Sequence, residues 1–164
     1  MDRTGASPGW GIAIHGDSSD IAEWKEAFRE GFDPWIEVLR GQIVVRSGLL
    51  ENLSSKDDVY ARGKALVERL NGAMGVLCGC DPVNVLGTVC ITPNGFPHTT
   101  MFAEGASFGS SRARAEAVAI GRDGKPIPTS PKPSLAQDWV PVADQDEWLN
   151  DALMYFGKSR VRTH

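Results

Sequence analysis

The stretch Ser54–Asn71, SSKDDVYARGKALVERLN, carries the clearest helix pattern in the chain. Ser54 and Ser55 are each followed three residues later by an aspartate, whose carboxylate can accept hydrogen bonds from free backbone N–H groups at a helix start. Apolar residues then recur at three- and four-residue steps, together with a glycine that would allow close packing: Val59, Gly63, Leu66, Val67 and Leu70. The pattern predicts a helix over residues 56–71 that ends at Asn71-Gly72 or at Gly75.

A strand, a helix and a hairpin are predicted before this helix. Residues 10–15 alternate apolar side chains on one face, as in a strand. Residues 20–30 have apolar side chains at helical spacing and are followed by Gly31, which suits a helix end. Residues 35–47 are rich in isoleucine and valine around Arg40-Gly41-Gln42, so we expect two β-segments joined by a tight turn.

The sequence after the 56–71 helix predicts more β-structure. Residues 83–92 are rich in β-branched residues and precede Asn94-Gly95, so we expect a second hairpin whose return strand lies at a sheet edge within residues 97–103. Residues 112–120 are ambiguous, because their alanine content favours a helix whereas strict alternation favours a strand. The turn-forming residues 122–125 directly downstream favour the strand.

The order of these elements predicts the fold class. As far as Ile91 the order is strand, helix, strand, strand, helix, strand, which is the ferredoxin-like βαββαβ order of an antiparallel sheet with both helices on one face. We therefore predict an α+β fold with a mainly antiparallel sheet, a ferredoxin-like start, additional β-hairpin strands and a C-terminal amphipathic helix. The sequence leaves the strand order of the sheet open.

The domain organisation follows from a proline-rich segment. Five of the chain's ten prolines lie in residues 125–141, so we expect an extended connector that forms neither a regular helix nor a central strand. The chain is therefore divided into an α+β core domain, the connector, a C-terminal helix that docks on the core or on a partner, and a basic tail: residues 1–124, 125–143, 144–157 and 158–164.

The C-terminal helix is strongly amphipathic and would end at Gly157. Its apolar face is the predicted interaction surface and consists of Trp148, Leu149, Ala152, Leu153 and Phe156. Because Trp24 lies on a comparable helical stripe, both Trp24 and Trp148 are expected in a core. The remaining tryptophans lie near element boundaries and are expected to be half-exposed: Trp10, Trp35 and Trp139.

The composition disfavours several functional classes. The chain has 164 residues, 41% of them hydrophobic, and a formal net charge of −4, so it lacks the broad positive field of a general nucleic-acid-binding protein. No apolar run approaches the ~18 residues that span a bilayer, and the first residues lack the pattern of a secretory signal. The three cysteines are an odd and sparse set, so we expect reduced thiols and a cytoplasmic location.

The loop Gly105-Ala106-Ser107-Phe108-Gly109 matches the pattern that exposes a nucleophilic serine on a strand-to-helix turn. Its context disfavours catalysis, because the only histidine after Ser107 is His164 at the extreme terminus. The same loop could instead bind an anion through its backbone N–H groups and nearby guanidinium groups. The residues of this candidate anion site are Gly105, Gly109, Ser110, Arg112 and Arg114.

Four potential zinc ligands lie close together in the sequence: Cys78, Cys80, Cys90 and His98. Zinc ligand pairs normally have about two to four intervening residues. Longer stretches separate Cys80 from Cys90 and Cys90 from His98, so the spacing disfavours a metal site. We therefore predict neither a metal nor another cofactor.

Two functional hypotheses remain. The first is a non-catalytic binding or protein-interaction module, a homo-oligomer if its C-terminal helix pairs with a second copy of the chain. The alternative is a small enzyme, or a small-molecule or anion sensor, with a cleft near His15, His98 and the Gly105–Gly109 loop. His15 is included because a histidine at a strand end can serve acid–base chemistry. Neither hypothesis requires a nucleic acid or a membrane as a partner.

Overall fold

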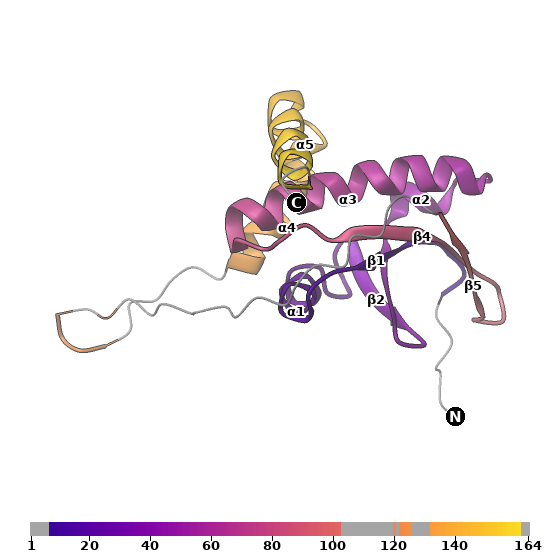
Figure 1. The fold of residues 1–164 in the computed structure, drawn as a ribbon, viewed down its shortest axis with the longest axis horizontal. Coiled ribbons are helices and arrows are strands. Elements are labelled where there is room, and N and C mark those ends of the chain that lie inside the picture. Colours follow the sequence, from indigo (N-terminus) through magenta and orange to yellow (C-terminus); the bar gives the residue numbers. More distant parts are fainter. Residues whose placement is uncertain (1–6, 103–119, 121, 126–131, 162–164) are drawn as a thin grey trace.

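The computed structural model describes residues 7–102, 120, 122–125 and 132–161, which form an α+β fold (Figure 1). Its strands form one antiparallel sheet in the order β2-β3-β1-β4-β5. The strand bounds are β1 Gly9–His15, β2 Trp35–Leu39, β3 Gln42–Arg46, β4 Asn84–Ile91 and β5 Pro97–Met101. The helix bounds are α1 Ser18–Ala27, α2 Gly48–Glu51, α3 Lys56–Cys78, α4 Lys132–Ala143 and α5 Glu147–Val161. The α+β class and the antiparallel sheet are confirmed. None of these helices is long and apolar enough to cross a membrane.

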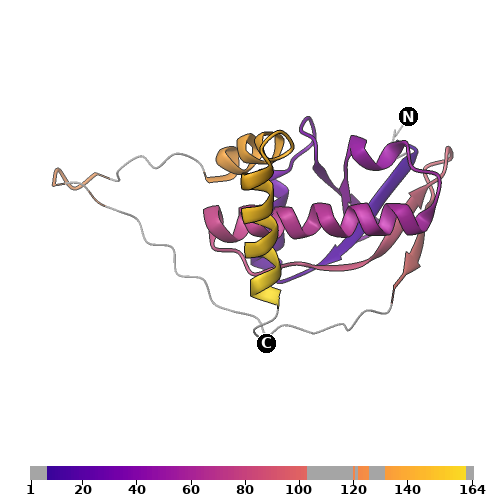
Figure 2. The ribbon, with the colours of Figure 1, turned by 90° about the horizontal axis from the view of Figure 1, so that it is seen from above.

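The main core lies between one face of the sheet and the helices. Ile12 of β1 belongs to the same buried cluster as Trp24 of α1 and Leu70 of α3. A Cβ at Gly63 would overlap the Ile12 side chain, so this glycine allows α3 to approach β1 closely, as predicted. α5 lies across α3 on the side away from the sheet, and Figure 2 shows this crossing from above. The molecule is therefore layered as sheet, α3 and α5.

The opposite face of the sheet is concave. Adjacent strands are about 4.8 Å apart, so β3 and β5, with β1 and β4 between them, would be about 14 Å apart in a flat sheet. Nevertheless, the Thr99 hydroxyl of β5 donates to the side-chain oxygen of Gln42 in β3 at 2.9 Å. The guanidinium carbon of Arg40 also lies 4.9 Å from the centroid of the Phe96 ring. The curled sheet encloses a second, small core: Ala13, Leu39, Val44, Val89 and Ile91.

α3 extends to Cys78 and is therefore longer than predicted. The buried Asn71 side chain donates to the backbone oxygen of Val83 at 3.0 Å and accepts from its N–H at 2.8 Å. A Cβ at Gly72 would overlap the backbone of α5. Asn71 and Gly72 thus serve tertiary contacts inside the helix, and Gly79, in the left-handed conformation with φ 65°, ends it.

The prediction of an extended connector is wrong for residues 132–143, which form α4. Pro133 stands in the first turn, where a missing N–H removes no helical hydrogen bond, and Pro141 lies in the last turn. Between them, Ala136 and Val140 are buried in the main core. This tertiary packing offsets the unfavourable local propensity of the prolines.

α5 begins and ends later than predicted. It runs from Glu147 through Gly157 to Val161 and so includes the first residues of the predicted basic tail. A Cβ at Gly157 would overlap the backbone carbonyl of Glu68 in α3. The glycine therefore allows two helix backbones to meet instead of ending the helix. The expectation that Trp148 is buried is also wrong, since 87% of its surface is exposed.

Candidate functional site

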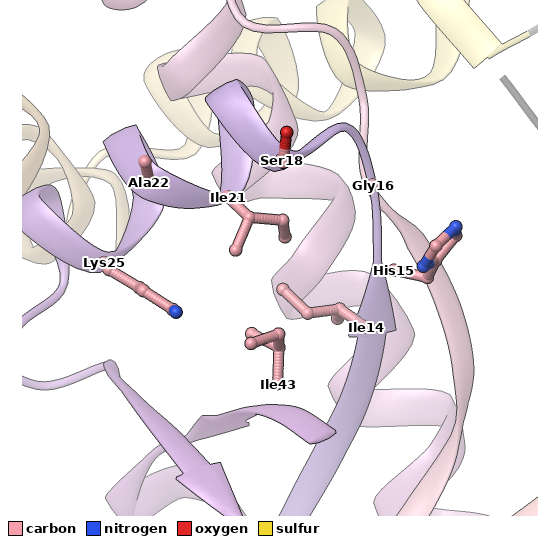
Figure 3. A pocket seen from close by; sticks show the side chains of 8 residues that line it. All are labelled: Ile14, His15, Gly16, Ser18, Ile21, Ala22, Lys25 and Ile43. Carbon is pink, nitrogen blue, oxygen red and sulfur yellow. The ribbon is translucent and has the colours of Figure 1, made fainter. Parts of the chain in front are cut away.

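A cavity of about 310 Å³ lies where the end of β1 meets α1 and β3. In Figure 3 the side chains of Ile14, Ile21 and Ile43 converge on it, and the Lys25 side chain points toward it from α1. Gly16 and Ala22 complete much of the rim. The cavity is thus mainly aliphatic, with one cationic group at its edge.

His15 lines the edge of this cavity, but its ring points away from the three isoleucines (Figure 3). This orientation follows from strand alternation, because Ile14 and His15 are neighbours in β1 and project to opposite faces. Among the lining side chains, Lys25 is then the only titratable group directed at the cavity. The side chains that line this cavity do not place two titratable groups opposite each other.

Asp17 caps the start of α1 beside the same cavity. Its carboxylate accepts from the Ser19 hydroxyl at 2.6 Å and from the Ser19 backbone N–H at 2.8 Å. These hydrogen bonds, led by the one from the hydroxyl, hold the pKa of Asp17 below its ordinary value. The carboxylate is therefore used for helix capping.

The four potential zinc ligands do not come together. Cys78 is the last residue of α3, and Cys80 lies two residues later in the chain. Cys90 in β4 is paired with His98 in the neighbouring strand β5. A strand rises about 3.3 Å per residue, so Cys90 lies roughly 20 Å from the start of β4, which is the end nearer to Cys78 and Cys80 in the chain. Within the described residues, no group of three or more His, Cys, Asp or Glu side chains could hold a metal ion.

The predicted serine and anion sites fall outside the residues that the structure describes. They belong to residues 103–119, and the set comprises Gly105, Ser107, Gly109, Ser110, Arg112 and Arg114. The predicted strand over residues 112–120 lies outside them as well, except for Ile120. These hypotheses stay as predictions.

The inner face of α5 docks on the same chain. Leu153 is buried in a cluster with Ala73 of α3 and Ala143 of α4, and Leu149 packs against this cluster. The helix thus docks on α3, and its layer is separated from the sheet by that helix (Figure 1). Two members of the predicted interaction surface, Leu149 and Leu153, are therefore used for intramolecular packing.

The outer face of α5 exposes aromatic side chains. Trp148 and Tyr155 are 87% and 77% exposed, and Ala152 between them is also exposed. These three residues have the i, i+4, i+7 spacing of one helical face, and we refer to them as the outer stripe. The Phe156 side chain is 36% exposed. Tyr155 was not among the predicted site residues, although its seven-residue distance from Trp148 places both on one face.

Comparisons with known proteins give no match. No family model matches the chain. No curated protein and no solved structure shows significant similarity to it.

Proposed function

We propose that this protein is a non-catalytic interaction module that self-associates through the outer stripe of α5. The exposure of Trp148 and Tyr155 carries the proposal. Tryptophan and tyrosine side chains are mostly buried in folded proteins, and both residue types are enriched at the centres of protein interfaces. Since the inner face of α5 is held by α3, the outer stripe is available without any rearrangement of the fold.

The charges along α5 favour a second copy of the chain as the partner. Asp151 lies beside the outer stripe in the first half of the helix, and Lys158 lies one heptad later in the second half. In an antiparallel pair of α5 helices, Tyr155 of each copy would pack over Ala152 of the other. The same pairing brings each Asp151 toward the other copy's Lys158. Such an interface is self-complementary, as a two-fold dimer requires.

Two finer features accompany this proposal. The βαββαβ part of the chain is a ferredoxin-like arrangement, which the strand order β2-β3-β1-β4 supports, and β5 extends it at one edge. The protein resides in the cytoplasm, which the three cysteines, Cys78, Cys80 and Cys90, support because they form no disulfide with one another.

Sedimentation equilibrium of the full chain tests the proposal. We expect a dimer for the natural sequence and a monomer for Trp148→Ser/Tyr155→Ser, because this variant removes the aromatic contact area. Val38→Ser is the matched control, since Val38 is 51% exposed on β2, away from α5, and the control should stay dimeric. A natural chain that is monomeric at about 100 μM, a concentration that would populate a dimer of moderate affinity, would exclude self-association.

A further inference from the structure

A second cavity, of about 230 Å³, lies where α2, α3 and α5 meet. Leu49, Leu66 and Met154 provide apolar walls from these three helices. Arg62 and Arg69 line it from α3, where they are two turns apart, and Asn150 lines it from α5. The cavity therefore combines an aliphatic interior with two guanidinium groups and one amide.

Arg69 is paired with Asp144 beside this cavity. Its side chain is 11% exposed, and its Nη1 donates to the Asp144 carboxylate and, at 3.5 Å, to the Asn150 side-chain oxygen. Its Nε–H is buried and has no hydrogen-bond partner among the described residues. Because this N–H is enclosed by protein atoms, a ligand in the cavity would pair with Arg62, whose side chain is exposed.

Arg62 supplies an uncompensated positive charge. Within the described part of the chain, it takes part in no ion pair or hydrogen bond. Because Asp144 offsets the charge of Arg69, the lining has a net charge of about one positive unit. A ligand with a single negative charge matches this balance, whereas a dianion would exceed it.

We propose that this cavity binds a small aliphatic monocarboxylate. The carboxylate pairs with the planar guanidinium group of Arg62, which can donate two parallel hydrogen bonds to it. The aliphatic tail lies against Leu49, Leu66 and Met154. Pockets for drug-sized ligands have volumes of about 300–1,000 Å³, so a cavity of 230 Å³ selects a shorter molecule.

Binding here would also join α3 to α5, because the cavity takes Asn150 and Met154 from α5 and both arginines from α3. The ligand would therefore stabilise the docked position of the C-terminal helix. It needs no second copy of the chain, so the site is independent of the proposed self-association.

Titration of the full chain with hexanoate, followed by two-dimensional amide NMR, tests the site. We expect saturable shifts that include Arg62, Asn150 and Met154, and affinity at least about tenfold lower for 1-hexanol, which keeps the tail but lacks the charge. Inorganic phosphate, which lacks the tail, should bind more weakly than hexanoate. Equal affinity for hexanoate and 1-hexanol, or tighter binding of phosphate, would overturn the proposal.

The decisive variant is Arg62→Gln, because Arg62 is exposed and holds no structural ion pair, so its replacement should leave the fold intact. We expect hexanoate affinity to fall at least about tenfold. Arg29→Gln is the matched control, since the Arg29 side chain is 61% exposed on the surface near α1 and should not affect binding. An equal loss in both variants, or shifts from hexanoate that avoid α3 and α5, would contradict this site.

Discussion

Arg46 is the most deeply buried charged side chain among the described residues, with 1% of its surface exposed. Desolvating a guanidinium group costs several kcal/mol unless hydrogen bonds and an opposite charge replace the water. Arg46 donates to the Ser7 carbonyl at 2.8 Å and to the Glu37 carboxylate at 3.0 Å, and its guanidinium carbon lies 5.4 Å from the centroid of the Trp35 ring. These contacts tie the segment before β1 to the β2–β3 hairpin.

Replacement of Glu37 should therefore destabilise the fold. In Glu37→Gln the carboxylate is lost while Arg46 stays charged and buried, so we expect the free energy of unfolding to fall by about 2 kcal/mol. Urea denaturation measures this value. Glu30→Gln is the control, because Glu30 is exposed and is not paired with Arg46. Equal midpoints for the two variants would show that the Arg46–Glu37 pair contributes little.

The cap at Asp17 predicts a pH dependence. Hydrogen bonds from Ser19 lower the pKa of this carboxyl in the folded state, so the charged form contributes stability above the ordinary aspartate pKa of about 3.9. That contribution is lost as the pH falls through the lower, folded-state pKa. Asp17→Ala should therefore reduce Tm more at about pH 6 than at about pH 2, measured by calorimetry at both pH values. A pH-independent difference in Tm would refute the role of the ionised cap.

At the scale of elements, local patterns predicted the strands well and the ends of the helices poorly. Alternation and turn residues are local properties, so β1, both hairpins and the edge position of β5 could be predicted. Gly72 and Gly157 look like helix ends in the sequence because glycine commonly occurs there. Their actual role, close contact between α3 and α5, depends on residues far apart in the chain. α4 was missed for the same reason, since its stability comes from packing on the core.

Gly157→Ala should release α5 from α3. An added Cβ would overlap the Glu68 carbonyl, and a helix backbone cannot move locally to relieve that overlap. We expect the cost of this overlap to exceed the gain in helix propensity of about 1 kcal/mol that alanine has over glycine. We expect faster amide hydrogen exchange in α5 and unchanged protection in β1 and β4. Glu147→Ala, at an exposed position of the same helix outside the outer stripe, is the control and should leave the protection of α5 unchanged. Protection of α5 equal to or above that of the natural chain would contradict the close-contact role.

At the scale of the molecule, the sequence located parts of the candidate surfaces but not their boundaries. Helical periodicity identified Trp148 and Ala152, yet it could not tell the docked face of α5 from the exposed one, because both carry apolar residues. The arginine-lined cavity was not predicted, since Arg62 and Asn150 become neighbours of one cavity only when α5 docks on α3. Val89 and Cys90 are neighbours in β4, so strand alternation directs their side chains to opposite faces of the sheet.

The direction of the proposed helix pair can be tested through its charges. In the antiparallel dimer, Asp151→Lys places like charges near the other copy's Lys158, and Lys158→Asp does the same near Asp151, so each change should weaken dimerisation several-fold. The combined variant restores opposite charges and should recover most of the affinity, which sedimentation equilibrium at low salt measures. Glu68→Gln controls for the ion pair between Lys158 and Glu68, at 3.5 Å. A combined variant that is weaker than both single ones would exclude the antiparallel arrangement, because a parallel pair does not bring these two positions together.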